Sequence, residues 1–559
     1  MNLIDGTDRG GVLPAVRMGK AALSFGALDD LTAHLAGLLH ERGVTPGDRV
    51  GLMIPNVPQF AVAYYGILRA GGIVVPMNVL LKRREVAFYL TDSDTRLMLA
   101  WHEVEQEAAA GAASAGTECI IARPGDFERL LAENRPRREV ADKVGSDTAV
   151  ILYTSGTTGQ PKGPELTHAN LRRTAEVTRR MFSIAPEEVL LGALPLFHAF
   201  GQTCALNVAI AARGCLTLVP RFDPTKVLEI IQRDRVNVFE GVPTMYVALL
   251  NHPEASSYDV SSLRLCISGG AALPVEVLRG FEEKFGCIVL EGYGLSETSP
   301  VASFNHPDRE RKPGSIGTPI DGVEMKLIDD GDEAVPPGEV GEIAIRGHNV
   351  MKCYWRRPDA TSEAVSADGW LRTGDLARTD EDGYFFIVDR KKELIIRAGY
   401  NVYPREIEEV LYEHPAIQEC AVIGIRHPEL GEEVGAAVSL RAGAEATAAE
   451  LRDFVKSQVA AYKYPRHVWL VTISPKGGRA RFSNGRSRYR PTCRPRWPRW
   501  QPEPDRPVAP GDQRPEGPAR SGDSRPGLPA SVTETDCGLI RMRCIRSLGG
   551  MRASISGGA

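Results

Sequence analysis

The sequence predicts an α/β protein with a large N-terminal domain of parallel-rich sheets with helices and a small C-terminal α/β domain. The chain has 559 residues, which is more than one hydrophobic core accommodates. From Leu28 to Pro319, short apolar runs typical of strands alternate with amphipathic helices, as in parallel α/β proteins. After about Gly338 the pattern changes to short Gly-punctuated strands, followed by a second, smaller α/β alternation.

The N-terminal part begins with a predicted helix, "ALDDLTAHLAGLLHERG", whose apolar residues keep helical spacing until Gly43. The runs "RVGLMIP", "AVILYTS" and "VNVFEGVP" are predicted strands because each is apolar and ends in turn residues. The longest apolar stretch, "FAVAYYGILRAGGIVVPM", is interrupted by Arg69 and a Gly-Gly pair. It is too short and too broken to span a bilayer, so we expect a helix, a turn and a buried strand.

The C-terminal part reads as strands in "GEVGEIAIRG" and "GYFFIVDR", a helix in "PREIEEVLYEHP", a strand in "ECAVIGI" and a helix in "AEATAAELRDFVKSQV". We place the domain boundary near Asp389. This gives a large domain at residues 1–388 and a small domain at residues 389–471. Residues 472–559 form a tail in which Arg, Pro, Gly and Ser predominate and no apolar period is visible.

Composition narrows the classes of function and location. The net charge of −4 gives no overall field that favours nucleic acid or an anionic membrane. The ten cysteines are scattered without Cys-x-x-Cys pairs, which indicates reduced thiols in a cytoplasmic protein. The first twenty residues lack the apolar core of a signal peptide. We expect no transmembrane segment and no nucleic-acid partner, and leave peripheral membrane contact and the oligomeric state open.

The most informative segment is "YTSGTTGQPKG", which runs from Tyr153 to Gly163 directly after a predicted buried strand. Glycines let several backbone N–H groups face one anion, and Ser and Thr hydroxyls add donors without bulk. Lys162 adds a positive charge. The segment is not a Walker A loop, because it contains no G-x-x-x-x-G-K-[ST]. Such a dense run of these residue types favours a polyphosphate-binding loop over a flexible polar turn.

This segment resembles the phosphate loop of the adenylate-forming enzymes, which include acyl-CoA synthetases, aryl-CoA ligases, luciferases and peptide-synthetase adenylation domains. Further motifs follow in that family's order: "PLFHAFG" (195–201), "SGGAALP" (268–274), "EGYGLSET" (291–298), "GWLRTGDLA" (369–377) and "DRKKELIIRAGYNVYPREIE" (389–408). The resemblance covers roughly Ser24 to Val471. It implies an acyl-CoA synthetase-like fold and a ligase that uses ATP, Mg²⁺ and coenzyme A.

The resemblance also implies a nucleotide site. Tyr293 would stack on adenine, Asp375 would accept hydrogen bonds from both ribose hydroxyls, and Arg390 would reach the same sugar. The implied nucleotide contacts are Thr154, Ser155, Gly156, Thr157, Thr158, Gly159, Gly269, Gly270, Ala271, Glu291, Gly292, Tyr293, Gly294, Thr298, Asp375 and Arg390.

Three residues are implied to act in the chemistry. Glu297 would bind Mg²⁺ with help from Thr154, because a hard cation with oxygen ligands assists the departure of pyrophosphate. Lys162 would face the phosphates. A lone His on an apolar face is more often a core residue, but the resemblance makes His198 the group that gates and orients the acyl carboxylate. By the same resemblance Gly399 and Tyr400 would line the pantetheine path of coenzyme A, and Lys392 would be the interdomain hinge.

The implied reaction has two steps. A small-molecule carboxylic acid attacks the α-phosphorus of ATP to form acyl-AMP, and the thiolate of coenzyme A then displaces AMP. "PLFHAFG" and "YTSGTTGQPKG" favour the fatty-acyl branch. The alternatives are an aryl-CoA ligase, an acyl-AMP ligase that supplies a carrier protein, and a non-catalytic remnant that binds an acyl group or a nucleotide.

The tail departs from the family. Where the family continues with a "P-K-G-x-x-G-K-I-L-K" loop, this chain reads "SPKGGRARFSNGRS". The chain as written therefore lacks the lysine expected to stabilise charge at the α-phosphate. We expect the rate of adenylation to be lower by a factor on the order of 10²–10³. The tail itself is expected to be disordered. An alternative is that its Arg-rich tract binds nucleic acid.

We interpret this departure as a one-nucleotide frame shift near Val471, in the gene or in its sequencing. Codons that encode Arg479 to Ser487 can be chosen so that, read one nucleotide earlier, they give Gly-Lys-Ile-Leu-Lys-Arg-Glu-Ile. Sequencing the codons from Val471 to Ser487 tests the hypothesis. We expect codons that regroup in this way, and codons that cannot regroup would refute it.

Overall fold

The computed structural model describes residues 2–3, 11–154, 161–391, 393–397, 400–427 and 430–471. The contacts between residues divide the chain into Met1–Tyr489 and Arg490–Ala559, and every described residue lies in the first unit. The tail at 472–559 lies outside the described residues. The domain boundary near Asp389 stays a prediction.

The described part of the large domain contains a seven-stranded sheet and a nine-stranded sheet, and each includes strands from distant parts of the chain. The seven-stranded sheet is parallel between β3, β4, β5, β6 and β7, whereas β8 and β18 are antiparallel. Its order is β18 (Cys353–Tyr354), β8 (Pro164–Thr167), β7 (Thr148–Ile151), β4 (Ile73–Pro76), β3 (Arg49–Met53), β5 (Thr95–Trp101) and β6 (Glu118–Ala122). Its helices are α1 (Phe25–Glu41), α2 (Pro58–Arg69), α3 (Arg83–Asp92), η1 (His102–Val104), α4 (Glu105–Ala115) and α5 (Asp126–Ala132).

The nine-stranded sheet is parallel across its centre, from β13 through β12, β11, β9 and β10 to β1. Its order is β15 (Thr318–Pro319), β14 (Ser303–Phe304), β13 (Ile288–Tyr293), β12 (Leu265–Ser268), β11 (Val238–Gly241), β9 (Val189–Gly192), β10 (Cys215–Leu218), β1 (Pro14–Met18) and β2 (Ala21–Ser24). Because parallel strands end at one edge, the loops that follow β9, β11, β12 and β13 lie near one another.

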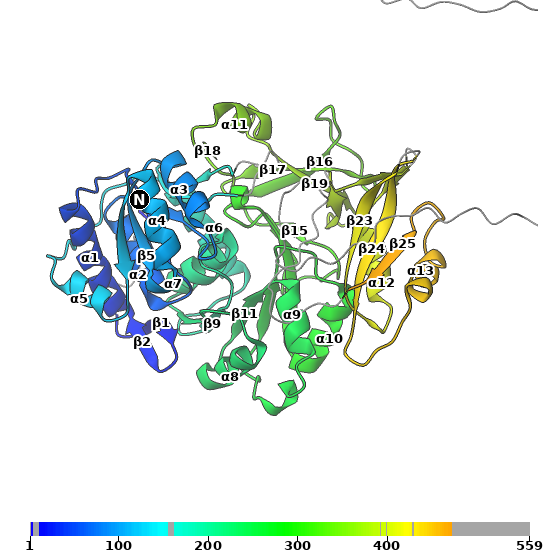
Figure 1. Ribbon diagram of the computed structural model, residues 1–559, viewed down its shortest axis with the longest axis horizontal. Helices are drawn as coiled ribbons and strands as arrows, with labels where there is room; N and C mark the ends of the chain where they lie inside the picture. The colour runs from blue at the N-terminus through cyan, green and yellow to red at the C-terminus, as the bar shows by residue number, and fades with distance from the viewer. Residues whose placement is uncertain are drawn as a thin grey trace, which may run out of the picture. The chain divides into compact units, whose positions relative to one another are not determined.

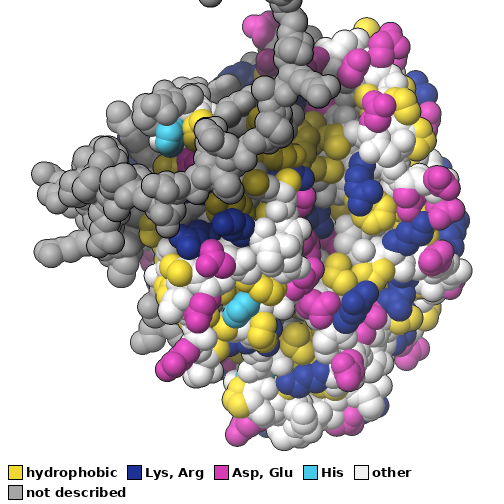
Figure 2. Space-filling view, turned by 90° about the vertical axis from the view of Figure 1, so that its right-hand side faces the viewer, with side chains coloured by type: hydrophobic (Ala, Val, Ile, Leu, Met, Phe, Trp, Pro, Cys, Tyr) yellow, Lys and Arg dark blue, Asp and Glu magenta, His cyan; other side chains and the backbone are white. Residues whose placement is uncertain are grey.

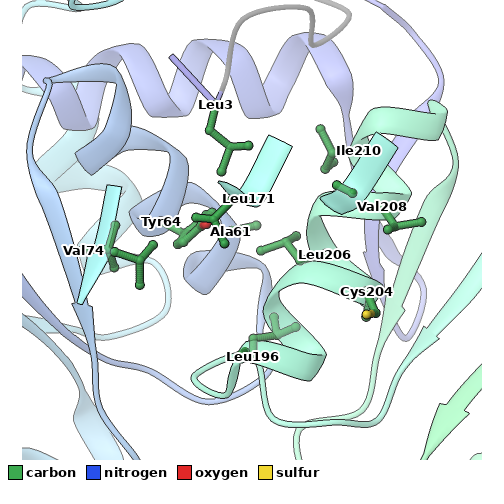
Figure 3. Packing of buried hydrophobic residues seen from close by; sticks show 14 of the residues in the cluster. Leu3, Ala61, Tyr64, Val74, Leu171, Leu196, Cys204, Leu206, Val208 and Ile210 are labelled. Carbon is green, nitrogen blue, oxygen red and sulfur yellow. The ribbon is translucent and has the colours of Figure 1, made fainter. Parts of the chain in front are cut away.

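Helices cover these strands (Figure 1). They are α6 (His168–Met181), the π-helix η2 (Gly201–Asn207), α7 (Val208–Ala212), α8 (Pro224–Asp234), α9 (Pro243–Leu250), η3 (Ala255–Ser257), α10 (Val275–Phe285) and η4 (Ser296–Thr298). The largest hydrophobic cluster joins α2 and β4 to η2 and α7, as Figure 3 shows for Tyr64, Val74, Leu206 and Ile210. The two sheets therefore share one apolar core.

Two smaller sheets complete the described chain. The first, antiparallel, is β16 (Val323–Ile328), β17 (Gly341–Gly347), β19 (Leu371–Thr379) and β20 (Phe385–Arg390), with α11 (Pro358–Ala364) between β18 and β19. The second is β22 (Tyr400–Val402), β21 (Ile395–Arg397), β24 (Gly431–Leu440) and β23 (Ile417–His427), with β25 (His467–Leu470) paired to β24. Its helices α12 (Pro404–Tyr412) and α13 (Ala448–Lys456) close a separate small core.

The predicted elements are confirmed, but several of their ends differ; β23, for example, extends beyond both ends of "ECAVIGI". The strand predicted in "AVILYTS" stops at Ile151, because the chain turns there and pairs Thr154 with Lys162. The last predicted helix begins only at Ala448, because the Thr447 side chain accepts a hydrogen bond from the Glu450 N–H and caps it. The apolar stretch after Phe60 forms α2, a turn and buried β4, as predicted.

Asn56 links the two large sheets. It follows β3 and is 4% exposed. Its Nδ2 donates to Gly192 O at 2.9 Å and to Leu194 O at 2.7 Å, and its Oδ1 accepts from Leu196 N at 2.9 Å. One amide therefore satisfies three backbone groups of the loop that follows β9. This loop leads directly to His198.

The described surface gives two further facts. Among the described residues, no helix combines the length and apolar character that crossing a bilayer requires. Figure 2 shows basic and acidic side chains interspersed over the face that it presents.

Candidate active site

The ends of the predicted phosphate loop are fixed to each other. Thr154 N donates to Lys162 O at 2.8 Å, and Lys162 N donates to Thr154 O at 3.1 Å. A Cβ on Gly163 would lie 2.7 Å from Ile151 Cγ2, so a side chain there would clash. The two described ends of the loop between β7 and β8 are thus held together. The predicted contacts Ser155, Gly156, Thr157, Thr158 and Gly159 lie outside the described residues.

The predicted ribose residues meet at one carboxylate. Asp375 is 5% exposed and lies opposite Arg390 in the register of β19 and β20. The Tyr293 hydroxyl donates to Asp375 Oδ2 at 2.6 Å, and Arg390 Nε lies 3.2 Å from Asp375 Oδ1. Burial, and then the Asp375 charge, raise the pKa of Tyr293 well above its usual range, so its hydroxyl keeps the proton that it donates. Three residues from three predicted motifs are therefore in contact.

The loop after β12 is open to a ligand. Gly269 N donates to Gly241 O at 3.3 Å, and a Cβ on Gly269 would lie 3.1 Å from Phe200 Cε1. Gly270 has φ +77°, a conformation that favours glycine. Gly270 and Ala271 are exposed. The loop is thus free of side-chain bulk where the prediction places adenine.

Four other residues predicted to contact the nucleotide hold or pack against the loops of this region. Buried Glu291 accepts a hydrogen bond from Leu273 N at 2.9 Å and so holds the loop after β12. A Cβ on Gly292 would lie 2.0 Å from Phe304 Cε1, and one on Gly294 would lie 1.5 Å from Pro300 O. Thr298 Oγ1 accepts from Leu295 N at 2.8 Å and closes the turn that carries Glu297.

Tyr354 joins two residues that the sequence predicted separately. Its hydroxyl donates to Glu297 Oε1 at 2.8 Å, and Lys162 Nζ lies 5.2 Å from the centre of its ring. Tyr354 is in β18, which pairs with β8 next to the phosphate loop. Sequence reasoning missed Tyr354, because nothing in "MKCYWRR" distinguishes this tyrosine from others. Thr154 and Lys162 share the paired loop ends, so the predicted metal and phosphate residues lie in one region.

His198 is exposed, between β9 and η2. Its ring centre lies 4.8 Å from that of Phe197, and its carbonyl accepts from Gln202 N at 2.9 Å. Because its side chain is exposed, His198 is not a buried core residue. Its role in gating and orienting the acyl carboxylate stays a prediction.

The residues predicted for coenzyme A are described only in part. Tyr400 is 58% exposed, and its ring stacks on Tyr462 with centres 4.8 Å apart. Gly399 and the predicted hinge Lys392 lie outside the described residues. Among the described residues of this part of the chain, Arg405 of α12 donates to Ile387 O of β20 at 3.0 Å.

Comparisons with known proteins identify the family to which the chain belongs. The family described as AMP-binding enzyme matches residues 8–355, and the AMP-binding enzyme C-terminal domain matches residues 406–480. The chain is 40% identical over 491 residues to a long-chain-fatty-acid–CoA ligase of Bacillus subtilis, covering 80% of this chain and 87% of the relative. It is 38% identical over 485 residues to a feruloyl-CoA synthase of an Amycolatopsis species, covering 85% and 95%. The crystal structure of ATP-bound MatB from Rhodopseudomonas palustris matches with a TM-score of 0.80 at 34% identity, covering 86% of this chain and 96% of that one.

Glu291 should make stability depend on pH. Burial raises its pKa to about 7, against a smaller opposing effect of Arg405. The folded state thus holds this proton more tightly than the unfolded state. The stabilisation is complete below pH ~4.5 and is lost as the pH rises through about 7. Between these pH values the unfolding temperature should therefore fall as the pH rises. We expect this fall to be shallower in Glu291→Gln.

The measurement is thermal unfolding at a series of pH values. Exposed Glu283→Gln is the matched control and should leave the slope unchanged. Glu408, whose pKa burial also raises to about 7, should retain part of the slope in Glu291→Gln. An unaltered slope in Glu291→Gln would contradict the assignment.

Proposed function

Because the chain belongs to the AMP-binding enzyme family and its relatives named above form CoA thioesters, we propose that it activates a carboxylic acid with ATP and transfers the acyl group to coenzyme A. The observation that carries the proposal is the contact of Tyr293 and Arg390 with Asp375, beside the loop of Gly269. This arrangement offers a carboxylate to a ribose and a backbone edge to a base. ATP is the substrate that these groups would bind.

In the first half-reaction, the substrate carboxylate attacks the α-phosphorus and pyrophosphate leaves. Negative charge grows on phosphate oxygens, so fixed positive groups lower the barrier most. Lys162, at the paired end of the phosphate loop, would supply one such charge. His198, exposed on the loop before η2, would orient the incoming carboxylate.

Glu297, with Thr154, would hold Mg²⁺. The carboxylate is half-buried and is oriented by the Tyr354 hydroxyl, so one oxygen is committed before any ligand arrives. Oxygen donors of this kind fit a hard cation that keeps most of its coordination for phosphate and water. When bound, Mg²⁺ would neutralise charge on the departing pyrophosphate. Tyr354 and Lys162 would fix the position of the phosphates around it.

In the second half-reaction, the thiolate of coenzyme A attacks the acyl carbon of acyl-AMP, and AMP leaves. We propose that Gly399 and Tyr400 line its path and that the small domain turns about Lys392 between the steps. A hinge requires few residues that can change φ and ψ. We propose that this reaction takes place in the cytoplasm.

Fatty acids are the first candidate substrates, because the long-chain-fatty-acid–CoA ligase of Bacillus subtilis is 40% identical to this chain. Aromatic acids are the second candidate, because the feruloyl-CoA synthase is 38% identical over a similar length. We further propose that the tail results from a frame shift and that adenylation by the chain as written is impaired. The rival from another class is a binding protein that no longer catalyses.

Tyr354→Phe should weaken the use of Mg²⁺ while leaving the protein folded. The variant keeps the ring beside Lys162 but loses the hydrogen bond to Glu297, and a bond to a charged group contributes ~1.5–3 kcal/mol. We expect the Mg²⁺ concentration that half-saturates the thermal protection by ATP to rise about tenfold or more. Tyr384→Phe, which removes the bond to the Glu310 carbonyl, is the matched control. Equal Mg²⁺ dependence in wild type and Tyr354→Phe would exclude this role.

The two half-reactions should separate. ATP–pyrophosphate exchange by the chain as written should be slower, by on the order of 10²–10³, than by a variant whose frame is restored after Val471. AMP release from supplied acyl-AMP and coenzyme A should fall less. A panel of fatty and aromatic acids identifies the substrate class. Equal exchange by the two chains would contradict the impairment, and exchange by neither chain with any acid would favour the non-catalytic remnant.

A further inference from the structure

Glu240 is a buried carboxyl in the centre of the nine-stranded sheet. It is the third residue of β11, lies opposite Ile267 of β12 and is 1% exposed. Side chains alternate along a strand. Val238 and Ile267 belong to the main core cluster, and Phe239 and Cys266 belong to the second cluster on the other face. Glu240 therefore points toward the face that bears the main cluster.

Neither carboxyl oxygen of Glu240 has a hydrogen-bond partner among the described residues. Burial raises its pKa well above the usual range, and a buried carboxyl with no partner to stabilise its charge favours the neutral form. A protonated carboxyl offers both an O–H donor and an acceptor oxygen. Buried polar groups are nearly always hydrogen-bonded, so an unpaired one requires an explanation.

The face to which Glu240 points is covered by η2, the helix that begins three residues after His198. The helix contacts β11. Cys204 of η2 is a close neighbour, since the Glu240 carboxyl adds to the effect of burial in raising the pKa of the Cys204 thiol. Figure 3 shows Cys204 and Leu206 on this helix, with Leu196 below. Gln202 Oε1 and Thr203 Oγ1, also of η2, are buried without partners among the described residues.

This region adjoins the predicted reaction centre. Gly241, next to Glu240, accepts a hydrogen bond from Gly269 N, and Phe200 borders Gly269. A chain or ring that runs from a carboxylate at His198 toward Glu240 would lie against η2, which contacts β11. π-helical segments are frequent at functional sites, which agrees with this position.

We infer that Glu240 is a specificity-determining residue that binds a hydroxyl group on the chain or ring of the substrate acid, so that the substrates are hydroxylated carboxylic acids. The inference rests on the proposed function and adds the substrate class. A hydroxyl can accept from and donate to a neutral carboxyl at once, whereas an unsubstituted fatty acid would leave Glu240 unpaired. A site built to pair with a hydroxyl discriminates strongly against the analogue that lacks it.

The test uses acyl-sulfamoyl-adenosines, which mimic acyl-AMP and do not react, so binding is measured without turnover. Pairs differ by one hydroxyl: coumaroyl against cinnamoyl, and saturated chains of graded length with and without a terminal hydroxyl. We expect the full-length chain to bind the hydroxylated member of at least one pair at least about tenfold more tightly by calorimetry. Glu240→Met should abolish this ratio, and Glu240→Gln should retain most of it.

Glu229→Met is the matched control, because Glu229 is exposed on α8 and the substitution is chemically the same. It should leave the ratio unchanged. Equal binding within every pair by the wild type would overturn the inference while leaving the proposed function standing, and this outcome does not depend on any variant folding. A wild-type preference that persists in Glu240→Met would also overturn it. Failure of every analogue to bind would instead count against the proposed function.

Discussion

The side chain of Asn56 holds the loop after β9 in place, and the geometry around His198 depends on it. Its amide bonds to Gly192, Leu194 and Leu196 while it is itself fixed at the end of β3 in the other large sheet. Each of these backbone groups is buried, so water cannot substitute for the amide. The same contact thus joins the two sheets and holds the loop that leads to His198.

The residues of the candidate site lie on elements that are distant in sequence. Tyr293 ends a central parallel strand, Asp375 and Arg390 come from the antiparallel sheet, and Tyr354 comes from an edge strand of the other large sheet. Each side chain is held by a partner that is also part of the site. Because the charges and hydroxyls are paired before a ligand binds, little reorganisation is needed when charge develops on a phosphate.

The fold could be predicted from the sequence because the apolar period is a local signal, and the motifs predicted residues that the structure brings into contact, such as Tyr293, Asp375 and Arg390. Residues such as Asp375 and Tyr293 were found through motifs that keep their residues within a few positions. Tyr354 and Glu240 could not be found in this way. The position of Tyr354 depends on the pairing of β18 with β8, which the sequence does not indicate. "VNVFEGVP" predicts only a buried strand, and the lack of a hydrogen-bond partner for Glu240 among the described residues is visible only in the structure.

The paired backbone of Thr154 and Lys162 has a consequence for affinity. Closing a loop costs conformational entropy, which grows slowly with loop length. Here the two ends are already joined by two hydrogen bonds in the ligand-free chain, so that cost is met during folding. A polyphosphate bound here as proposed would therefore lose no binding free energy to bringing these two ends together.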